Sequence, residues 1–577
     1  MADHAVPSTS ANGSAEEVGL INGQVPPKDR APAPVVNVTG YHPPNWLPAE
    51  VLGSRSRKAV VLYSVGILSL LAVTAAAGYS LAKGGNFDAS QPGNDASRPR
   101  ARNVIMMISD GFGPASETFA RSYHQTINEQ DVSWKSPLDE LLVGASRTRS
   151  SNSLITDSAA GATAFSCALK SYNGAIGVAP DETPCGTVLE AAKRKGLLTG
   201  LVATSRITHA TPAAFSAHVV QRNMEDLIAQ QQIGNYSMGR VVDLMLGGGA
   251  CHFVPMSAER SCRTDNVDVL RAAREDYGFT HLSSAAELEA LTPGNTRLPV
   301  LGLFADDHME YEIDRSHSHQ PALADMATKA LDLLKHASAG QSEGFFLMIE
   351  GSRIDMAAHA NDPATHVHEV EAYWEAVRVV KKFVDENPGT VLVSTSDHET
   401  GGLTIGRQLN TTYPEYVWHP EALTPVTRSM EKAALELLSY NAGDERRRFV
   451  RKVVLPQWLG VTDATDKEIK QLSTHTDYYE LRETLTEMIS RRALIGWSTH
   501  GHTGVDVNLY AYGAGADFLR GNHENTEVGE FIVKALDLDL QAVTDHIQND
   551  STHQPRPDVP EKFLYRRSDC VHEMHYH

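Results

Sequence analysis

The stretch Asn103-Val-Ile-Met-Met-Ile-Ser-Asp-Gly111 decides the fold class, because a continuous apolar run ends directly in an acidic residue. Three further apolar runs occupy residues 197–205, 344–351 and 390–398, and the last two also close on acidic residues. Apolar runs with helical patterns between them are typical of a mostly parallel sheet covered by helices on both faces. We therefore predict an α/β fold. Ligands of such sheets bind at the carboxyl ends of the strands, where the acidic residues lie.

Histidine and further acidic residues gather close to these strand ends and in a Gly-rich segment near the C-terminus. They are Asp355, His359, Asp397, His398, His500 and His502. Asp355 and His359 are four residues apart, so on a helix they would share one face and could bind one metal ion. Asp397 and His398 close a strand, where burial is costly unless a cation pairs with them. Each pair alone has an ordinary structural explanation, but the pairs together indicate a metal site.

Ser158 is the candidate nucleophile. It lies in the segment Ile155-Thr-Asp-Ser-Ala-Ala-Gly-Ala-Thr-Ala164, whose small residues are typical of a tightly packed helix start. A serine there lies at the positive end of the helix dipole, which stabilises both an alkoxide and a phosphate. An ordinary helix-capping serine is the alternative, and by itself the more common one. The nearby metal-ligand patterns favour the catalytic interpretation.

The overall charge limits the class of partner. With 51 Lys and Arg against 71 Asp and Glu, the formal net charge is −20. A chain this acidic repels nucleic acid, so we expect no nucleic-acid binding. A phosphate site in this chain must therefore supply its own local positive charge, which metal ions would provide.

Residues 59–81 predict a membrane anchor, because they form an uncharged and mainly apolar run. About 20 such residues suffice to cross a bilayer. The run is too long and too far from the start for a cleaved signal peptide. Arg55, Arg57 and Lys58 precede it and Lys83 alone follows closely, so the positive-inside rule places the N-terminus in the cytosol. We expect a single-pass type II membrane protein with its catalytic domain in a lumen or outside the cell.

The remaining organisation follows from composition. We predict a disordered tail over 1–58, the signal anchor over 59–81, a linker over 82–100, a catalytic domain over 101–545 and a flexible tail over 546–577. Residues 405–495 are richer in charge and carry helical patterns without strand-end acids. We interpret them as a peripheral inserted subdomain.

Glycosylation sequons and cysteines both follow the predicted anchor, as expected of a lumenal domain. The sequons begin at Asn235, Asn410 and Asn549. Plausible local disulfides are Cys167–Cys185 and Cys251–Cys262, which leave Cys570 unpaired, although spacing alone does not decide the pairing.

The combined motifs ISDG, TDSAAGATA, THATPAA…R, EGSRID…H, SDHETGG and HTGVDV resemble those of the alkaline phosphatase family over about residues 100–530. With its N-terminal anchor, the chain is most similar to the fungal vacuolar, repressible type. The resemblance implies hydrolysis of phosphate monoesters at alkaline pH through a phosphoserine, with two zinc ions and one magnesium ion per subunit. It also implies a homodimer at the vacuole membrane. Small phosphate monoesters are the implied substrates, with phosphopeptides as a further candidate.

The family's roles fall on matching residues. Ser158 would become phosphorylated, and the planar guanidinium of Arg222 would bind two oxygens of the substrate phosphate. One zinc ion would be held by Asp355, His359 and His502, and the second, which activates Ser158, by Asp110, Asp397 and His398. Magnesium would lie between Asp110, Thr211 and Glu350. Zinc coordination lowers the pKa of a serine hydroxyl, which is otherwise a poor nucleophile near neutral pH.

Three positions call for separate expectations. His209 stands where some bacterial members carry Asp, so we expect it to act on magnesium through water. Met356 stands where other branches place Lys or His near the phosphate, which bears on the pH optimum and on phosphate affinity. His500 competes with His502 as a zinc ligand, and the register of the following segment, 504–513, favours His502.

Other functions fit the sequence less well. A sulfatase needs a C/S-x-P-x-R motif, which is absent around Ser158. The phosphodiesterase branch of the same superfamily typically lacks the magnesium set of Thr211 and Glu350, which this chain retains. A catalytically dead adaptor would have lost metal ligands, and none is lost. We therefore expect a phosphomonoesterase, with the phosphodiesterase as the main alternative.

Overall fold

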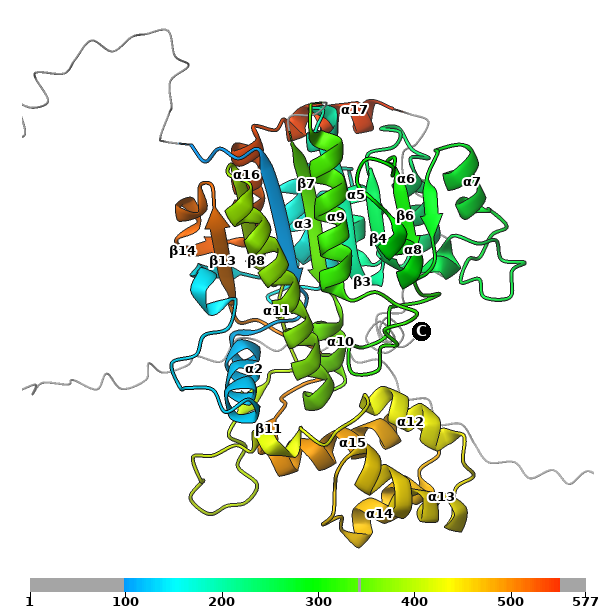
Figure 1. The fold of residues 1–577 in the computed structure, drawn as a ribbon, viewed down its shortest axis with the longest axis vertical. Coiled ribbons are helices and arrows are strands. Elements are labelled where there is room, and N and C mark those ends of the chain that lie inside the picture. The colour runs from blue at the N-terminus through cyan, green and yellow to red at the C-terminus, as the bar shows by residue number, and fades with distance from the viewer. Residues whose placement is uncertain (1–97, 341–343, 551–577) are drawn as a thin grey trace, which may run out of the picture. The chain divides into compact units, whose positions relative to one another are not determined.

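The computed structural model describes residues 98–340 and 344–550 (Figure 1). Their centre is a ten-stranded sheet in the order β14-β2-β13-β8-β1-β7-β3-β4-β6-β5. The seven strands from β8 to β5 run parallel to one another, and β13 is antiparallel to both β8 and β2. The predicted mostly parallel sheet is thus confirmed.

The four predicted apolar runs form four neighbouring strands of this sheet. They are β8 (Thr390–Thr395), β1 (Asn103–Ser109), β7 (Phe345–Gly351) and β3 (Leu198–Arg206). The other strands are β4 (Leu244–Gly248), β6 (Val300–Leu303), β5 (Thr280–Leu282), β13 (Val507–Gly513), β2 (Leu142–Arg147) and β14 (Gly521–Glu524). Every residue of β1, β7 and β8 is buried, which explains why these strands are apolar throughout.

Helices cover both faces of the sheet, and alternate residues of β1 pack against opposite layers. Ile105 and Met107 belong to the core on one face, together with residues of α2 (Pro114–Ile127), α9 (Leu323–Ser338) and α11 (Pro363–Glu386). Val104 and Met106 belong to the core on the other face. That second layer contains α4 (Val188–Arg194), α5 (Ala210–Ser216) and α16 (Asn525–Leu536). In Figure 1, α9 and α11 lie in front of the sheet and α3 (Ser158–Cys167) and α5 behind it.

Residues 405–495 contain four α-helices that lie at one end of the molecule, beyond the sheet (yellow to orange in Figure 1). They are α12 (Met430–Leu438), α13 (Asp444–Phe449), α14 (Asp466–Thr474) and α15 (Tyr478–Ala493), with a π-helical segment, Val450–Trp458, between α13 and α14. An antiparallel pair, β10 (Thr404–Ile405) with β11 (Ile495–Gly496), joins the two ends of the segment. The buried apolar residues of α12, α14 and α15 belong to the same core as α9 and α11.

The remaining helices lie near the edges of the sheet or carry the site. They are α6 (Glu225–Ile233), α7 (Val269–Glu275), α8 (Ala285–Ala290), α10 (Arg353–His359) and α17 (Leu540–Asn549). Helix α17 extends past the predicted end of the catalytic domain at residue 545. Val543 and Ile547 are buried together with Ala191, which explains why the ordered helix continues.

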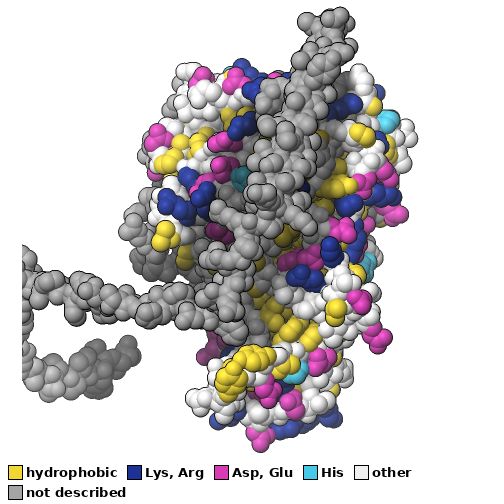
Figure 2. All heavy atoms as spheres, turned by 90° about the vertical axis from the view of Figure 1, so that its left-hand side faces the viewer, with side chains coloured by type: hydrophobic (Ala, Val, Ile, Leu, Met, Phe, Trp, Pro, Cys, Tyr) yellow, Lys and Arg dark blue, Asp and Glu magenta, His cyan; other side chains and the backbone are white. Residues whose placement is uncertain are grey.

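Two predicted disulfides, Cys167–Cys185 and Cys251–Cys262, are confirmed. The described residues do not include the predicted tail over 1–58, the anchor over 59–81, most of the linker over 82–100 or most of the tail over 546–577 with Cys570. Within the described ranges, no helix has both the length and the apolar character needed to cross a membrane. On the face drawn in Figure 2, Lys and Arg side chains are interspersed with Asp and Glu, so charges of one sign are not segregated there.

Candidate active site

The carboxyl ends of three neighbouring strands bring three predicted acids together. Asp110 directly follows β1, Glu350 lies near the end of β7, and Asp397 follows β8. Strand β1 pairs with both neighbours at Ile108, which lies opposite Glu350 on one side and Thr395 on the other. All three acidic side chains are fully buried. The sheet topology therefore places them at one edge, as the sequence predicts.

Two of the predicted ligand sets converge. Asp355, His359 and His502 each offer a ligand atom, and these atoms lie within 4.8 Å of one another. His359 Nε2 is 3.0 Å from His502 Nε2 and 3.3 Å from Asp355 Oδ2. His502 donates its Nδ1–H to the carbonyl of Thr156 at 2.8 Å, which turns Nε2 toward the cluster. Asp355 and His359 lie one turn apart on α10, as predicted.

The second set is Asp110, Asp397 and His398, whose ligand atoms also lie within 4.8 Å of one another. His398 Nε2 is 3.2 Å from Asp397 Oδ2 and 3.6 Å from Asp110 Oδ1. His500 is not part of either set. Its Nε2 lies 3.2 Å from Glu483 Oε2, and its Nδ1 donates to the carbonyl of His359 at 2.8 Å. The geometry thus favours His502 over His500 as the histidine of the first set.

The buried carboxylates fit metal ions because their oxygens lack other partners. Both oxygens of Asp110, Oδ2 of Asp355 and Oδ2 of Asp397 accept no hydrogen bond from the described residues. Burial, followed by the charges of Asp397 and Asp355, raises the pKa of Asp110 well above its usual range. Crowded, buried acids without donors are costly, and divalent cations would compensate them.

Thr211 and His209 approach the site from the start of α5. Burial raises the pKa of Glu350 to about 7, and the nearby hydroxyls of Ser352 and Thr211 oppose that shift. His209 precedes α5 as its N-cap residue and is also buried. Oxygen ligands from Asp110, Glu350 and Thr211 are the donors that magnesium prefers. This set therefore suits a harder cation than the two histidine-containing sets.

Ser158 is the first residue of α3, and Asp157 caps the helix by accepting a hydrogen bond from the Ala160 N–H at 3.0 Å. Ser158 Oγ lies 3.1 Å from His398 Nε2. The candidate nucleophile is therefore in hydrogen-bond contact with the second ligand set. The small residues of α3 permit this, because a Cβ on Gly161 would lie only 2.9 Å from Asp397 Cβ.

Arg222 is held between two residues of the site. Its Nη1 donates to Asp157 Oδ2 at 3.2 Å, and its Nη2 donates to His209 Nε2 at 3.0 Å. Burial, followed by the charges of Arg222 and Arg206, lowers the pKa of His209 well below its usual range, so His209 is a neutral acceptor. Arg222 is 5% exposed, and its guanidinium is thereby fixed next to the residue that precedes Ser158.

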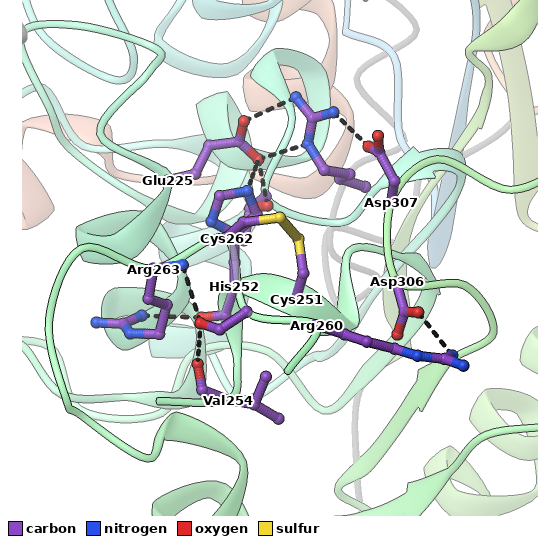
Figure 3. Close-up of a disulfide and its surroundings, with 12 residues drawn as sticks. Glu225, Cys251, His252, Val254, Arg260, Cys262, Arg263, Asp306 and Asp307 are labelled. Atoms are coloured by element: carbon purple, nitrogen blue, oxygen red, sulfur yellow. Dashed lines mark hydrogen bonds and ion pairs between the residues drawn. A yellow bond between two sulfur atoms is a disulfide. The ribbon is translucent and has the colours of Figure 1, made fainter. Parts of the chain in front are cut away.

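A second arginine network, centred on Arg206, is not indicated by the sequence. Arg206 binds both oxygens of Glu225, at 2.9 and 2.8 Å, and one oxygen of Asp307 at 2.6 Å. Figure 3 shows Glu225 beside His252 and the Cys251–Cys262 disulfide. Cys251, His252 and Cys262 also lie within ligand distance of one another, but the disulfide removes the thiolates that a metal would need. Asp157 was not among the predicted site residues, although its helix-capping position directly before Ser158 could have indicated it.

Comparison with known proteins agrees with this geometry. The model of the alkaline phosphatase family matches residues 101–538. The chain is 50% identical over 459 residues to an alkaline phosphatase of Schizosaccharomyces pombe, covering 79% of this chain and 85% of that protein. It is 47% identical over 487 residues to the repressible alkaline phosphatase of Saccharomyces cerevisiae, covering 80% and 86%. A solved cold-active alkaline phosphatase from the psychrophile Shewanella sp. is 33% identical with a TM-score of 0.64, covering 74% and 98%.

The fold, the strand-end site and these relatives together define an enzyme that hydrolyses phosphate monoesters. The chain belongs to the alkaline phosphatase family.

Proposed function

We propose that the protein hydrolyses phosphate monoesters at alkaline pH through a phosphoserine intermediate on Ser158, with two zinc ions and one magnesium ion. The observation that carries this proposal is the 3.1 Å distance from Ser158 Oγ to His398 Nε2. It joins a helix-start serine to a ligand set that also contains Asp110 and Asp397.

The metal ions would be held by the sets described above. One zinc ion would be held by Asp355, His359 and His502, the second by Asp110, Asp397 and His398, and magnesium by Asp110, Thr211 and Glu350 with His209 nearby. A variant of the TAB5 alkaline phosphatase, 28% identical with a TM-score of 0.53, has Mg bound in its M3 site, which supports a magnesium ion in this family. When bound, such ions acidify nearby hydroxyl groups and compensate negative charge on phosphate oxygens.

Arg222 and α3 bind and orient the substrate phosphate. Asp157 and His209 fix the guanidinium of Arg222, so its planar fork is oriented before substrate arrives and little entropy is lost on binding two phosphate oxygens. The N-terminal end of α3 adds its partial positive charge at Ser158. Local positive charge thus offsets the −20 background for an anionic substrate.

The proposed reaction takes place in two steps. Ser158 Oγ loses its proton and attacks phosphorus, the bond from phosphorus to the leaving oxygen breaks, and that oxygen gains a proton and departs as an alcohol. A water oxygen then attacks the phosphorus of the phosphoserine and loses a proton, the bond to Ser158 Oγ breaks, Ser158 Oγ regains a proton, and inorganic phosphate leaves. Because Ser158 is 1% exposed, the nucleophile is screened from bulk water in the first step.

The test is hydrolysis of p-nitrophenyl phosphate by residues 84–577 made by a secretory route. We expect activity that rises toward alkaline pH, falls with a chelator and returns with zinc plus magnesium. Ser158→Ala should lower kcat by at least about a thousandfold while leaving circular dichroism unchanged. Acid-quenched wild-type enzyme should carry phosphate on Ser158 by mass spectrometry. Full activity in Ser158→Ala would refute the mechanism, and preferential cleavage of bis-p-nitrophenyl phosphate would favour the phosphodiesterase.

The cellular setting is part of the same proposal. An uncharged run over 59–81 supports a type II anchor, and similarity to the fungal repressible enzymes supports the vacuole membrane. Asn235, Asn410 and Asn549 are all exposed, which supports glycosylation in a lumen. Fractionation of fungal membranes with a glycosidase mobility shift tests anchor and glycans together. Light scattering on the secreted fragment tests the expected homodimer.

A further inference from the structure

A cavity of about 600 Å³ lies between the segment that follows β6 and two helices of the 405–495 region. Six of its lining residues carry the argument: His308, Tyr311, Arg353, Glu431, Tyr478 and Tyr479. Arg353 begins α10, Glu431 lies in the first turn of α12, and the two tyrosines begin α15. The cavity is therefore built jointly by the catalytic sheet region and the helical insert.

The cavity borders the catalytic site on two sides. Arg353 lies two residues before Asp355, and its Nη1 contacts the sulfur of Met356 at 3.3 Å. On the other side, the ring centroid of His308 is 5.2 Å from that of His209, which accepts the hydrogen bond of Arg222. The cavity thus adjoins both the helix that carries Asp355 and the histidine that positions Arg222.

Arg353 is the buried charge of this cavity. The residue is 7% exposed, and its guanidinium lies 3.6 Å from the centre of the Tyr311 ring. Its Nε has no hydrogen-bond partner, and the carboxylates of Glu431, Glu369 and Asp307 act on its charge without a direct ion pair among the described residues. A buried guanidinium without a direct counter-ion is costly, and a ligand anion would compensate it.

The acids that line the cavity are differently placed. Asp307 is paired with Arg206 at 2.6 Å. Asp314 accepts the Ser429 N–H at 3.1 Å and lies 4.0 Å from Lys432. Glu431 is only partly buried, and its Oε2 accepts a long hydrogen bond of 3.5 Å from the hydroxyl of Tyr311. The fourth lining acid, Glu310, accepts the Ser316 N–H at 3.0 Å, and Lys432 is the second lining cation. Arg353 is the buried cation of the cavity, with Glu431 as an opposing charge.

We propose that this cavity is a leaving-group site that favours phosphate monoesters carrying a second anionic group, a carboxylate or a second phosphate, which pairs with Arg353. The inference rests on the proposed phosphomonoesterase function and adds a substrate class to it. Tyr311, Tyr478 and Tyr479 supply aromatic walls, so an aromatic acid is a suitable leaving group.

The test compares two aryl phosphates, phenyl phosphate and 4-carboxyphenyl phosphate, on the metal-loaded enzyme. The measured quantity is the ratio of kcat/KM for the carboxylated over the neutral ester, which removes effects common to both. Arg353→Met keeps the size of the side chain and removes its charge. We expect the ratio to fall by about tenfold, the worth of one charge-assisted contact. Glu431→Gln removes the opposing charge, and the ratio should rise severalfold.

Glu445→Gln, an exposed acid on α13 outside the cavity, is the matched control and should leave the ratio unchanged. If Arg353→Met does not fold, the sign of the change in Glu431→Gln decides. An unchanged or lower ratio in Glu431→Gln would overturn the proposal, as would a wild-type preference for 4-(aminomethyl)phenyl phosphate over the carboxylated ester. If the wild-type enzyme cleaves neither aryl phosphate, the proposed function fails and the leaving-group site fails with it.

Discussion

Gly161 illustrates how closely single residues of this site approach one another. It lies on α3, one turn after Ser158, where an added Cβ would meet Asp397 Cβ at 2.9 Å. Glycine inside a helix costs about 1 kcal/mol relative to alanine. The close approach to Asp397 accounts for a glycine at a position where helix propensity favours alanine.

Gly161→Ala should therefore impair the metal site without unfolding the protein. The added methyl group pushes Asp397 away from Asp110 and His398, so we expect loss of bound zinc and a fall in kcat of roughly tenfold or more. Zinc content by mass spectrometry and p-nitrophenyl phosphate hydrolysis measure both effects. Gly501→Ala is the control, because its Cβ would meet only Thr499 Oγ1, at 3.4 Å. A Gly161→Ala enzyme with full zinc content and wild-type rate would contradict the argument.

Between β3 and α5, the chain segment that carries His209 is held by a buried ion pair. Arg206 ends β3, and Glu225 is the first residue of α6. Glu225 accepts hydrogen bonds from Arg206 and also from Thr208 Oγ1 at 2.6 Å. One carboxylate thus fixes two residues just before His209, whose ring positions Arg222. The network links the elements of the site rather than contacting the substrate.

Glu225→Gln should lower the free energy of unfolding by about 1–3 kcal/mol, since it removes the bidentate partner of the buried Arg206, which keeps its ion pair with Asp307. Denaturant unfolding curves measure the loss. Asp306→Asn is the matched control, because it breaks the exposed Arg260–Asp306 pair seen in Figure 3, at 2.9 Å, and should cost less than about 1 kcal/mol. Equal losses in the two variants would show that the buried network stabilises the fold no more than an exposed ion pair does.

The same comparison has a defined pH dependence. Burial alone would raise the pKa of Glu225, but the charge of Arg206 holds it well below its usual range. A carboxyl group with a lowered pKa contributes stability above its unfolded pKa, here about 4.5, and that stability is lost as the pH falls further. The difference between wild type and Glu225→Gln should stay constant from about pH 5 to 8 and shrink below about pH 4.5.

How much of the fold the sequence predicts depends on the element. Strands β1, β7, β8 and β3 are buried on both faces, so their continuous apolar runs could be predicted as strands from the sequence. The strands at the antiparallel edge could not be predicted in this way. β2 includes Leu142, which is 51% exposed, and β14 has the polar sequence Gly-Asn-His-Glu. Strands buried in the sheet centre carry their signal locally, whereas edge strands depend on the neighbour with which they pair.

The site divides in the same way. Ligand sets such as Asp355 with His359 follow from local spacing, and the strand-end acids follow from topology. The Arg206 network could not be predicted, because its partners Glu225 and Asp307 lie 19 and 101 positions away and no local pattern marks them. The cavity at Arg353 was also hidden, since it forms only where the helices of the insert meet the sheet region.

Over the whole molecule, metal ions and stability should be linked. An acidic chain with net charge −20 gathers Asp110, Glu350, Asp355 and Asp397 at one buried edge of its sheet. These groups repel one another unless cations lie between them. Ions that bind the folded chain and not the unfolded one stabilise it by about 2.7 kcal/mol at a hundredfold excess over Kd. The ions proposed for the reaction should therefore also contribute to folding.

Removing the metals should accordingly lower the melting temperature by several degrees, and zinc plus magnesium should restore it. The shift should persist in Ser158→Ala, which keeps both ligand sets, so it reports binding rather than turnover.

The chelated protein should also lose stability as pH rises from about 4.5 to about 7, because burial raises the pKa of Glu350 to about 7 and its ionisation then opposes folding. Metal-loaded protein should lack this decline, since bound cations favour the ionised carboxylate. Calorimetry of both forms at pH 5, 6 and 7 measures the effect, and identical curves would show that the acidic cluster does not hold metal.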